Sequence, residues 1–89
     1  MLILTTPTFD RTRKKFPKNQ TPALDKAVRA IAKNPQTGEA KKGDLKGVYV
    51  YKFKVLDKEY LLAYLIPVKG EIKLLTIGTH ENFYRDIKK

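Results

Sequence analysis

Two lysines spaced two residues apart are the first candidates for chemistry in this chain. Lys52 and Lys54 alternate with aromatic residues in Tyr51-Lys52-Phe53-Lys54. An extended backbone places residues i and i+2 on one face, about 7 Å apart, so both ammonium groups can reach one phosphodiester. The simpler interpretation is that they line the solvated side of a strand. We expect them to be catalytic residues that act on a phosphate.

A histidine and a tyrosine near the C-terminal end form the second candidate pair. His80 is the single histidine of the chain, and Tyr84 stands four residues further on. Imidazole titrates near neutral pH and can pass a proton in either direction, and residues four apart lie on the same side of a helical turn. The alternative is that His80 is an N-terminal helix residue without a chemical role. We expect His80 and Tyr84 to be catalytic.

The charge balance indicates a polyanionic partner. The chain has 19 Lys and Arg against 9 Asp and Glu, a formal net charge of +10. Lys and Arg bind phosphate backbones largely through the release of condensed counterions, so we expect salt-dependent binding to nucleic acid. The alternative is that the lysines only keep a small protein soluble. The polar segment 36–47 carries three further lysines that could flank a phosphate groove: Lys41, Lys42 and Lys46.

Length and composition exclude several classes of function. With 89 residues the chain has room for one compact domain, which we expect to span residues 1–89. It has no cysteine and one histidine, so we expect no metal site and no cofactor. No apolar run approaches the roughly 20 residues of a membrane span, and Leu2-Ile3-Leu4 is too short for a signal peptide. We expect a soluble, cytoplasmic protein that does not interact with membranes.

The N-terminal half predicts a strand and two helices. Leu2-Ile3-Leu4 is typical of a short strand. The first helix is expected to have Thr8 as its N-cap and to end at Pro17. The second is expected to have Thr21 as its N-cap and to end at Asn34-Pro35, because the residue before a proline is pushed out of the α region. Its core stripe follows the spacing i, i+3, i+4, i+7 at Leu24, Ala27, Val28 and Ile31.

The C-terminal half changes from helical to alternating periodicity. After the predicted loop 36–47, strands are expected at 48–56, 59–66 and 71–77, and the middle one is apolar on both faces, as a central strand is. Residues 78–89 are expected to form a loop and a short helix. The predicted fold class is α+β in the order β-α-α-β-β-β, with two helices packed on a mainly antiparallel four-stranded sheet and a short C-terminal helix.

Nearly the whole chain resembles the RelE/ParE superfamily of toxins from type II toxin-antitoxin systems. The resemblance rests on five segments: the helical pair ending at Asn34-Pro35, Leu45-Lys46-Gly47, Tyr51-Lys52-Phe53-Lys54, Tyr60-Leu61-Leu62-Ala63-Tyr64, and, most diagnostic, Ile77-Gly78-Thr79-His80-Glu81-Asn82-Phe83-Tyr84. RelE-like members are ribosome-dependent endoribonucleases that cleave mRNA in the A site without metal. They do so by attack of a ribose 2′-hydroxyl on the adjacent phosphodiester. The resemblance implies that activity here, together with a cognate antitoxin protein as partner.

The resemblance also implies roles for individual residues. Lys52 and Lys54 are similar to the strand lysines with which some RelE-type members activate the 2′-hydroxyl and hold the phosphate. His80 and Tyr84 are similar to the histidine and aromatic pair of a neighbouring branch. We expect Lys54 or His80 to be the base, Lys52 to stabilise the developing charge, and protonated His80 to be the general acid. Tyr84 is expected to orient His80 or to stack on a base.

One position departs from the pattern of the family. Many relatives have an arginine directly after the first tyrosine of the Tyr-x-x-x-Tyr strand, whereas this chain has Leu61. Either Arg85 or one of the loop lysines supplies that phosphate contact, or the activity is weak. The departure keeps open a ParE-like function, the poisoning of DNA gyrase without cleavage of RNA. The third alternative is an RNA-binding module without catalysis.

Overall fold

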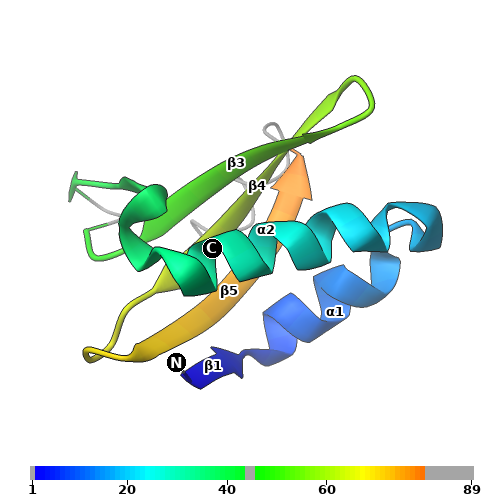
Figure 1. The fold of residues 1–89 in the computed structure, drawn as a ribbon. Coiled ribbons are helices and arrows are strands. Elements are labelled where there is room, and N and C mark those ends of the chain that lie inside the picture. The colour runs from blue at the N-terminus through cyan, green and yellow to red at the C-terminus, as the bar shows by residue number, and fades with distance from the viewer. Residues whose placement is uncertain (1, 44–45, 80–89) are drawn as a thin grey trace.

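The fold is a mixed sheet with two helices on one face (Figure 1). The computed structural model describes residues 2–43 and 46–79. In chain order the elements are β1 (Leu2–Thr5), α1 (Pro7–Lys15), a 3-10 turn (Lys18–Gln20), α2 (Thr21–Lys33), a second 3-10 turn (Pro35–Thr37), β2 (Glu39–Ala40), β3 (Tyr49–Val55), β4 (Lys58–Leu65) and β5 (Glu71–Thr79). The strands lie in the order β1-β5-β4-β3-β2, with β1 parallel to β5 and the other pairs antiparallel. The predicted α+β class, with two helices packed on a mainly antiparallel sheet, is confirmed.

The prediction of four strands and a continuous loop over 36–47 is wrong. Within that segment β2 pairs with β3, Glu39 opposite Val50 and Ala40 opposite Tyr49. Two residues are too few to show an alternating pattern, so the sequence carried no signal for this strand. The predicted loop after residue 77 also begins too early, because β5 continues to Thr79, which pairs with Tyr60. The C-terminal helix expected within 78–89 lies outside the described residues.

Helix α1 begins earlier than predicted, with Thr6 rather than Thr8 as its N-cap. The Thr6 hydroxyl accepts a hydrogen bond from the Phe9 N–H at 3.1 Å and donates toward the carbonyl oxygens of Leu74 and Leu75 at 3.1 and 3.0 Å. Pro7 fits the first helical position because it has no N–H to leave unpaired there. The cap therefore also attaches the start of the helix to β5.

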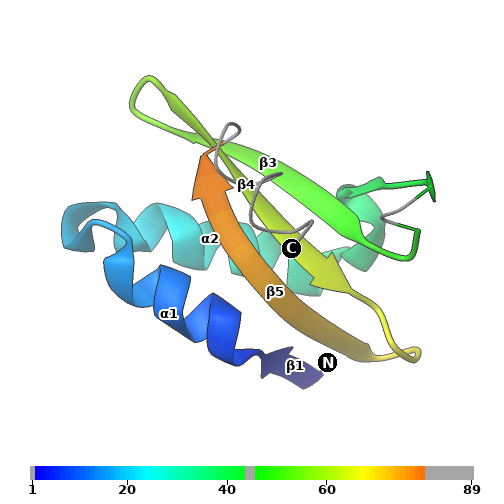
Figure 2. The same ribbon diagram turned by 180° about the vertical axis from the view of Figure 1, so that it is seen from behind.

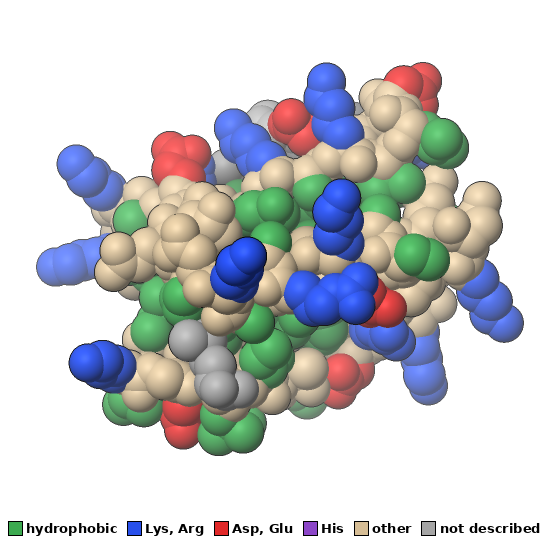
Figure 3. Space-filling view, viewed as in Figure 1, with side chains coloured by type: hydrophobic (Ala, Val, Ile, Leu, Met, Phe, Trp, Pro, Cys, Tyr) green, Lys and Arg blue, Asp and Glu red, His purple; other side chains and the backbone are tan. Residues whose placement is uncertain are grey.

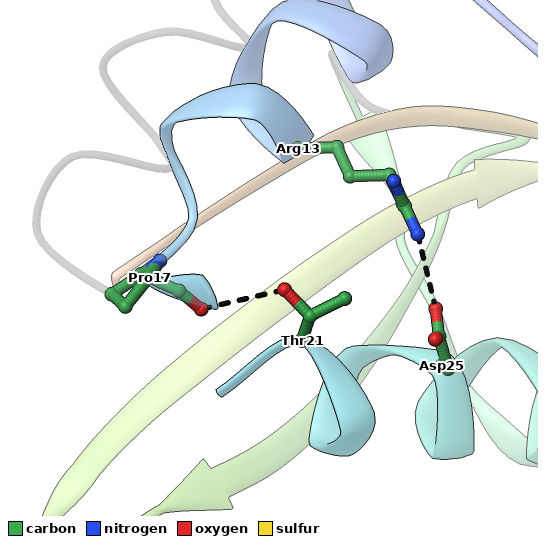
Figure 4. Close-up of polar contacts among 4 residues, drawn as sticks. All are labelled: Arg13, Pro17, Thr21 and Asp25. Atoms are coloured by element: carbon green, nitrogen blue, oxygen red, sulfur yellow. Dashed lines mark hydrogen bonds and ion pairs between the residues drawn. The ribbon is translucent and has the colours of Figure 1, made fainter. Parts of the chain in front are cut away.

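Helix α2 begins at Thr21, so that Gln20 and not Thr21 is its N-cap. A 3-10 turn precedes the helix, and the Thr21 hydroxyl donates back to the Pro17 carbonyl oxygen at 3.4 Å (Figure 4). The same view shows Arg13 of α1 paired with Asp25 of α2 at 3.4 Å. Both side chains of this pair are about half exposed, and such pairs contribute at most about 1 kcal/mol. The two helices are therefore held mainly by the core beneath them.

The main core lies between the helices and the sheet. The predicted stripe of α2 supplies Leu24, Ala27 and Ile31, all buried, and the helix ends at Asn34 as predicted. From the sheet the core receives Val55, Tyr60, Leu62, Tyr64, Ile72, Leu74 and Ile77. A smaller buried cluster of Val50, Leu61 and Ala63 lies on the opposite face. Strand β4 is thus buried on both faces, as its apolar sequence predicted.

One buried tyrosine attaches the turn after α2 to the sheet. The Tyr64 hydroxyl donates to the Pro35 carbonyl oxygen at 2.6 Å and accepts from the Gly38 N–H at 3.0 Å. Its ring stacks on Tyr49 with centroids 5.4 Å apart. A Cβ atom on residue 38 would lie 2.5 Å from the Tyr64 hydroxyl oxygen, so this approach requires glycine. The contact fixes the point from which the lysine-bearing segment 38–47 starts.

Candidate functional site

The two strand lysines lie on the face of the sheet that the helices do not cover. We call this the second face; it is turned toward the viewer in Figure 2. Tyr51 and Phe53 pack toward the helices, whereas Val50 belongs to the opposite cluster. Alternation along β3 therefore places Lys52 and Lys54 on the second face, and both are exposed. The predicted sharing of one face by these lysines is confirmed.

The register defines what lies beside each lysine. Lys52 is paired with Leu61 of β4, which is paired in turn with Gly78 of β5. Lys54 is paired with Glu59. Within residues 2–43 and 46–79, neither lysine makes an ion pair or a side-chain hydrogen bond. Their ammonium groups are therefore available for an anionic ligand.

Leu61 gives the lysine pair an apolar neighbour. Its side chain is completely buried and packs with Val50 and Ala63. A phosphate-binding group is thus absent from the described cross-strand row of Lys52, because Leu61 and Gly78 offer no polar side chain. An anion beside Lys52 would be held by the two lysines and by groups from outside this row.

His80, Tyr84 and Arg85 lie outside the described residues. The last described residue, Thr79, pairs with Tyr60 near the start of β4, one register position from the pair of Glu59 and Lys54. The chain therefore enters segment 80–89 from the end of the sheet that carries Lys54. The proposed joint action of His80 and the lysines is compatible with this connection and stays a prediction.

The loop lysines lie toward the other end of β3. The Lys41 N–H donates to the Val48 carbonyl oxygen at 2.9 Å, and the Lys41 ammonium lies 3.3 Å from Glu39. Lys42 and Lys46 are exposed. Four residues of strand separate Val48 from Lys52, about 13 Å at 3.3 Å per residue. The structure does not bring these lysines together with Lys52 and Lys54, so they suit a different part of an extended ligand.

Positive charge is spread over the molecule and is not confined to the second face. Lys and Arg side chains project from the left, top and right of the helix-bearing side and from its centre, with fewer Asp and Glu among them (Figure 3). On the second face the alternation of β5 adds Lys73, which sequence analysis did not single out although Glu71-Ile72-Lys73-Leu74 alternates visibly. Both faces of the sheet therefore contribute to the long-range attraction of a polyanion.

The described part of the chain has neither a metal-binding cluster nor a membrane-spanning helix. No group of three His, Cys, Asp or Glu side chains in residues 2–43 and 46–79 is placed to hold a metal ion. No helix among those residues is long and apolar enough to cross a membrane.

Comparison with known proteins identifies the family. The family model described as the ParE-like toxin of type II bacterial toxin-antitoxin systems matches residues 3–88. The chain belongs to this toxin family. No curated protein matches it in sequence.

Solved structures of RelE toxins share the fold of this ParE-like toxin. A chain of the RelBE2 toxin-antitoxin complex from Mycobacterium tuberculosis is 18% identical with a TM-score of 0.76, over 89% of this chain and 96% of that one. A chain of the intact E. coli RelBE complex is 16% identical with a TM-score of 0.69, over 88% and 94%. A mutant of the E. coli toxin RelE in the free state is 15% identical with a TM-score of 0.72, over 98% and 94%. At these identities the likeness concerns the fold.

Proposed function

We propose that this ParE-like toxin is a metal-independent, ribosome-dependent endoribonuclease that cleaves mRNA in the cytoplasm. The observation that carries the proposal is the placement of Lys52 and Lys54. They are exposed on one face, two residues apart, and neither forms an ion pair among the described residues, although Glu59 lies opposite Lys54 in the register. A phosphodiester in contact with both would be polarised by the Lys52 ammonium and would have Lys54 within reach as a second cation or as the base.

The proposed reaction is an internal transesterification. The ribose 2′-oxygen attacks the adjacent phosphorus, the bond from phosphorus to the 5′-oxygen breaks, and a 2′,3′-cyclic phosphate and a 5′-hydroxyl are formed. Either Lys54, as the free amine, accepts the 2′-proton, or neutral His80 accepts it and so becomes the imidazolium; the Lys52 ammonium stabilises the charge on the phosphorane oxygens. His80 as imidazolium gives a proton to the leaving 5′-oxygen, with Tyr84 orienting it or stacking on a base.

Substrate binding is assigned to the remaining basic residues. The exposed Lys42 and Lys46, together with Lys41, contact the RNA backbone away from the reacting phosphate. Because Leu61 supplies no cation beside Lys52, Arg85 is proposed to hold the phosphate there. Affinity should then fall steeply with salt, as it does when several phosphates are neutralised.

A cognate antitoxin is proposed as the protein partner, since a free toxin of this kind would be lethal to the cell. The net charge of +10 favours an antitoxin segment that is acidic or amphipathic. The complex with the product of the adjacent gene should weaken as salt rises. Failure of that product to bind, or complete indifference of the complex to ionic strength, would remove the electrostatic part of this proposal.

A second candidate function is poisoning of DNA gyrase without RNA cleavage. Two observations favour it: the matching family is described as ParE-like, and the buried Leu61 occupies the position where many RNA-cleaving relatives have arginine. The two functions differ in what they require of His80. An RNase loses its activity when the His80 imidazole is removed, whereas a gyrase poison remains toxic without it.

The deciding experiment compares the wild-type toxin with His80→Gln on translating ribosomes. Primer extension along the translated mRNA should show new 5′ ends with the wild type. With His80→Gln the cuts should fall by about two orders of magnitude at equal ribosome binding, the scale for loss of one acid-base group. Absence of cuts with a toxic, folded wild-type protein, and toxicity retained by His80→Gln, would favour the gyrase function instead.

A further inference from the structure

The strand β1 lies at one edge of the sheet, and its outer side is open (Figure 2). The Leu2 N–H donates to the Gly70 carbonyl oxygen at 2.9 Å, so the backbone groups of Leu2 point toward β5. Because backbone groups alternate in direction along a strand, those of Leu4 also point toward β5, whereas those of Ile3 and Thr5 point away from it. Within the described part of the chain no group pairs with the backbone of Ile3 or Thr5 on that outer side.

The sequence of β1 lacks the features that usually keep an edge strand from pairing. Such strands are commonly protected by lysine, by proline within the strand or by a bulge. Segment 1–8 has no charged side chain although the whole chain has a net charge of +10, and β1 pairs with β5 in regular register over its four residues. Ile3 packs into the main core, so alternation places Leu2 and Leu4 on the second face, where they are 53% and 38% exposed.

We propose that β1 pairs antiparallel with β1 of a second copy of this chain, around a two-fold axis at Leu4. In this register Ile3 of each copy lies opposite Thr5 of the other. Each of the two pairs exchanges two N–H···O=C bonds, which satisfies all outward backbone groups of both strands. The two Leu4 side chains meet at the axis as a close pair without hydrogen bonds between them, on the second face.

The register around Leu4 is the one that matches the open groups of two identical strands. An axis at Thr5 would place Ile3 opposite Pro7, which has no N–H to donate. An axis at Ile3 would place Thr5 opposite residue 1, outside the strand. Only the axis at Leu4 sets the two outward residues of one strand against the two outward residues of the other.

The charge distribution favours a second copy over an acidic partner at this edge. Segment 1–8 offers an acidic chain no cation, and two uncharged strands do not repel each other on contact. The register partners of Leu2 and Leu4 on β5 are Glu71 and Lys73, whose charges cancel. One short strand from each copy buries less than the roughly 1,000 Å² of a stable interface, so we expect a transient dimer that forms at high protein concentration.

The dimer would present the lysine pairs of both copies to the same side. Its two-fold axis is perpendicular to the sheet, so the two sheets become one and both second faces point the same way. In the order β1-β5-β4-β3, each β3 lies three strand positions from β1. The two pairs of Lys52 and Lys54 are then seven strand spacings apart, about 34 Å at about 4.8 Å each. The dimer rests on the edge of β1 alone and not on the proposed RNase activity.

The dimer is tested with the full-length toxin in the absence of RNA and antitoxin. In sedimentation equilibrium the average mass should rise from that of the monomer toward twice that value as the protein reaches millimolar concentration. In a mixture of isotope-labelled and unlabelled protein, filtered NOE spectra should show contact between the Leu4 Hα atoms of the two copies. A mass that stays monomeric at millimolar protein, or a dimer without this contact, would overturn the proposal.

Salt distinguishes this dimer from complexes with polyanions. Screening of the repulsion between two copies of charge +10 should lower the dissociation constant of the dimer about threefold or more between about 50 and 500 mM NaCl. Binding of RNA weakens over the same range. A dimer that weakens as salt rises would be held by charge pairs, which contradicts the pairing of β1.

Two pairs of variants test the strand, and circular dichroism checks that each is folded. Leu4→Lys sets like charges against each other at the axis and should weaken the dimer at least tenfold. Leu56→Lys adds the same charge at an exposed apolar residue of the turn between β3 and β4 and should change it little. Thr5→Pro removes an outward N–H without breaking a bond to β5 and should abolish the dimer, whereas Thr5→Val should keep it.

The outcomes of these comparisons are distinct. Equal dimerisation of Leu4→Lys and Leu56→Lys, or of Thr5→Pro and Thr5→Val, would overturn the proposal. If the Ile3 and Thr5 amides are protected from hydrogen exchange only when antitoxin is added, the edge belongs to the antitoxin and the self-pairing of β1 is wrong.

Discussion

Lys52 and Leu61 face each other across β3 and β4, one exposed and the other completely buried. The candidate phosphate site is thus bounded by an apolar side chain that packs against Val50 and Ala63. Such a site holds an anion with the two lysines of β3, because Leu61 of β4 offers the anion no polar group. The strength of catalysis should therefore depend on this one cross-strand position.

Leu61→Arg should increase RNA cleavage per folded molecule about tenfold or more, because a guanidinium beside Lys52 would stabilise the phosphorane. The same change should lower the free energy of unfolding by more than about 2 kcal/mol, because the position is buried. Cleavage normalised to the folded fraction and urea denaturation measure the two effects. Leu61→Met is the control and should alter neither by much. A fall in normalised cleavage with Leu61→Arg would show that the reacting phosphate is not beside Lys52.

Tyr64→Phe should lower the free energy of unfolding by about 1 to 3 kcal/mol. The change leaves the Pro35 carbonyl and the Gly38 N–H without their partner while the ring still stacks on Tyr49. Tyr60→Phe is the matched control, because the Tyr60 hydroxyl has only a long contact of 3.5 Å with Gln20, and it should cost less. Equal costs of the two changes in urea denaturation would contradict the role given to the Tyr64 hydroxyl.

The stability of the toxin should fall as the pH rises above about 10. Burial raises the pKa of Tyr64 above its ordinary value of 10.0; the Gly38 N–H lowers this pKa, and the nearby Tyr49 and Tyr51 raise it further. Between the ordinary pKa and the raised one, the unfolded chain loses this proton while the folded chain keeps it. Stability therefore decreases with pH in this window, by at most about 1.4 kcal/mol per pH unit for one proton. Urea midpoints from pH 9 to 11 should show a steeper fall for the wild type than for Tyr64→Phe, and parallel curves would be evidence against the raised pKa.

Leu56→Gly should stabilise the protein by about 0.5 to 1 kcal/mol. Leu56 has a φ of 59° and is 82% exposed in the turn between β3 and β4, so its side chain strains the backbone and contributes little burial. Asp57→Gly in the same turn is the control and should bring no gain, because Asp57 has no positive φ. Thermal melts of both variants check this, and an equal response would mean that the φ of Leu56 is not the source of strain.

The elements that sequence analysis predicted correctly are those whose pattern repeats within one segment. The stripe of α2 and the alternation of β3 are such patterns, and the faces of Lys52 and Lys54 followed from the latter. The features that were missed depend on residues distant in the chain. Thr6 is the cap because the carbonyls of Leu74 and Leu75 are nearby, which no local pattern reveals.

The contact between Tyr64 and Gly38 spans 26 residues and fixes a turn that had been interpreted as plain loop. Strand β2 exists because β3 offers it an edge, and its two residues carry no pattern of their own. The candidate site was therefore predictable as far as it lies on β3. His80, Tyr84 and Arg85 themselves lie outside the described residues, so their contributions to the site stay predictions.

The most direct test of the account is the rate of mRNA cleavage on translating ribosomes by three alanine variants that each remove one positive charge. Lys52→Ala and Lys54→Ala alter the proposed site, whereas Lys14→Ala alters an exposed residue of α1 on the opposite side of the sheet. All three should keep the free energy of unfolding within about 0.5 kcal/mol of the wild type. We predict that cleavage falls by about two orders of magnitude for Lys52→Ala and Lys54→Ala and stays near the wild-type rate for Lys14→Ala. Cleavage by the two strand variants at the rate of Lys14→Ala would contradict the assignment of the active site to β3.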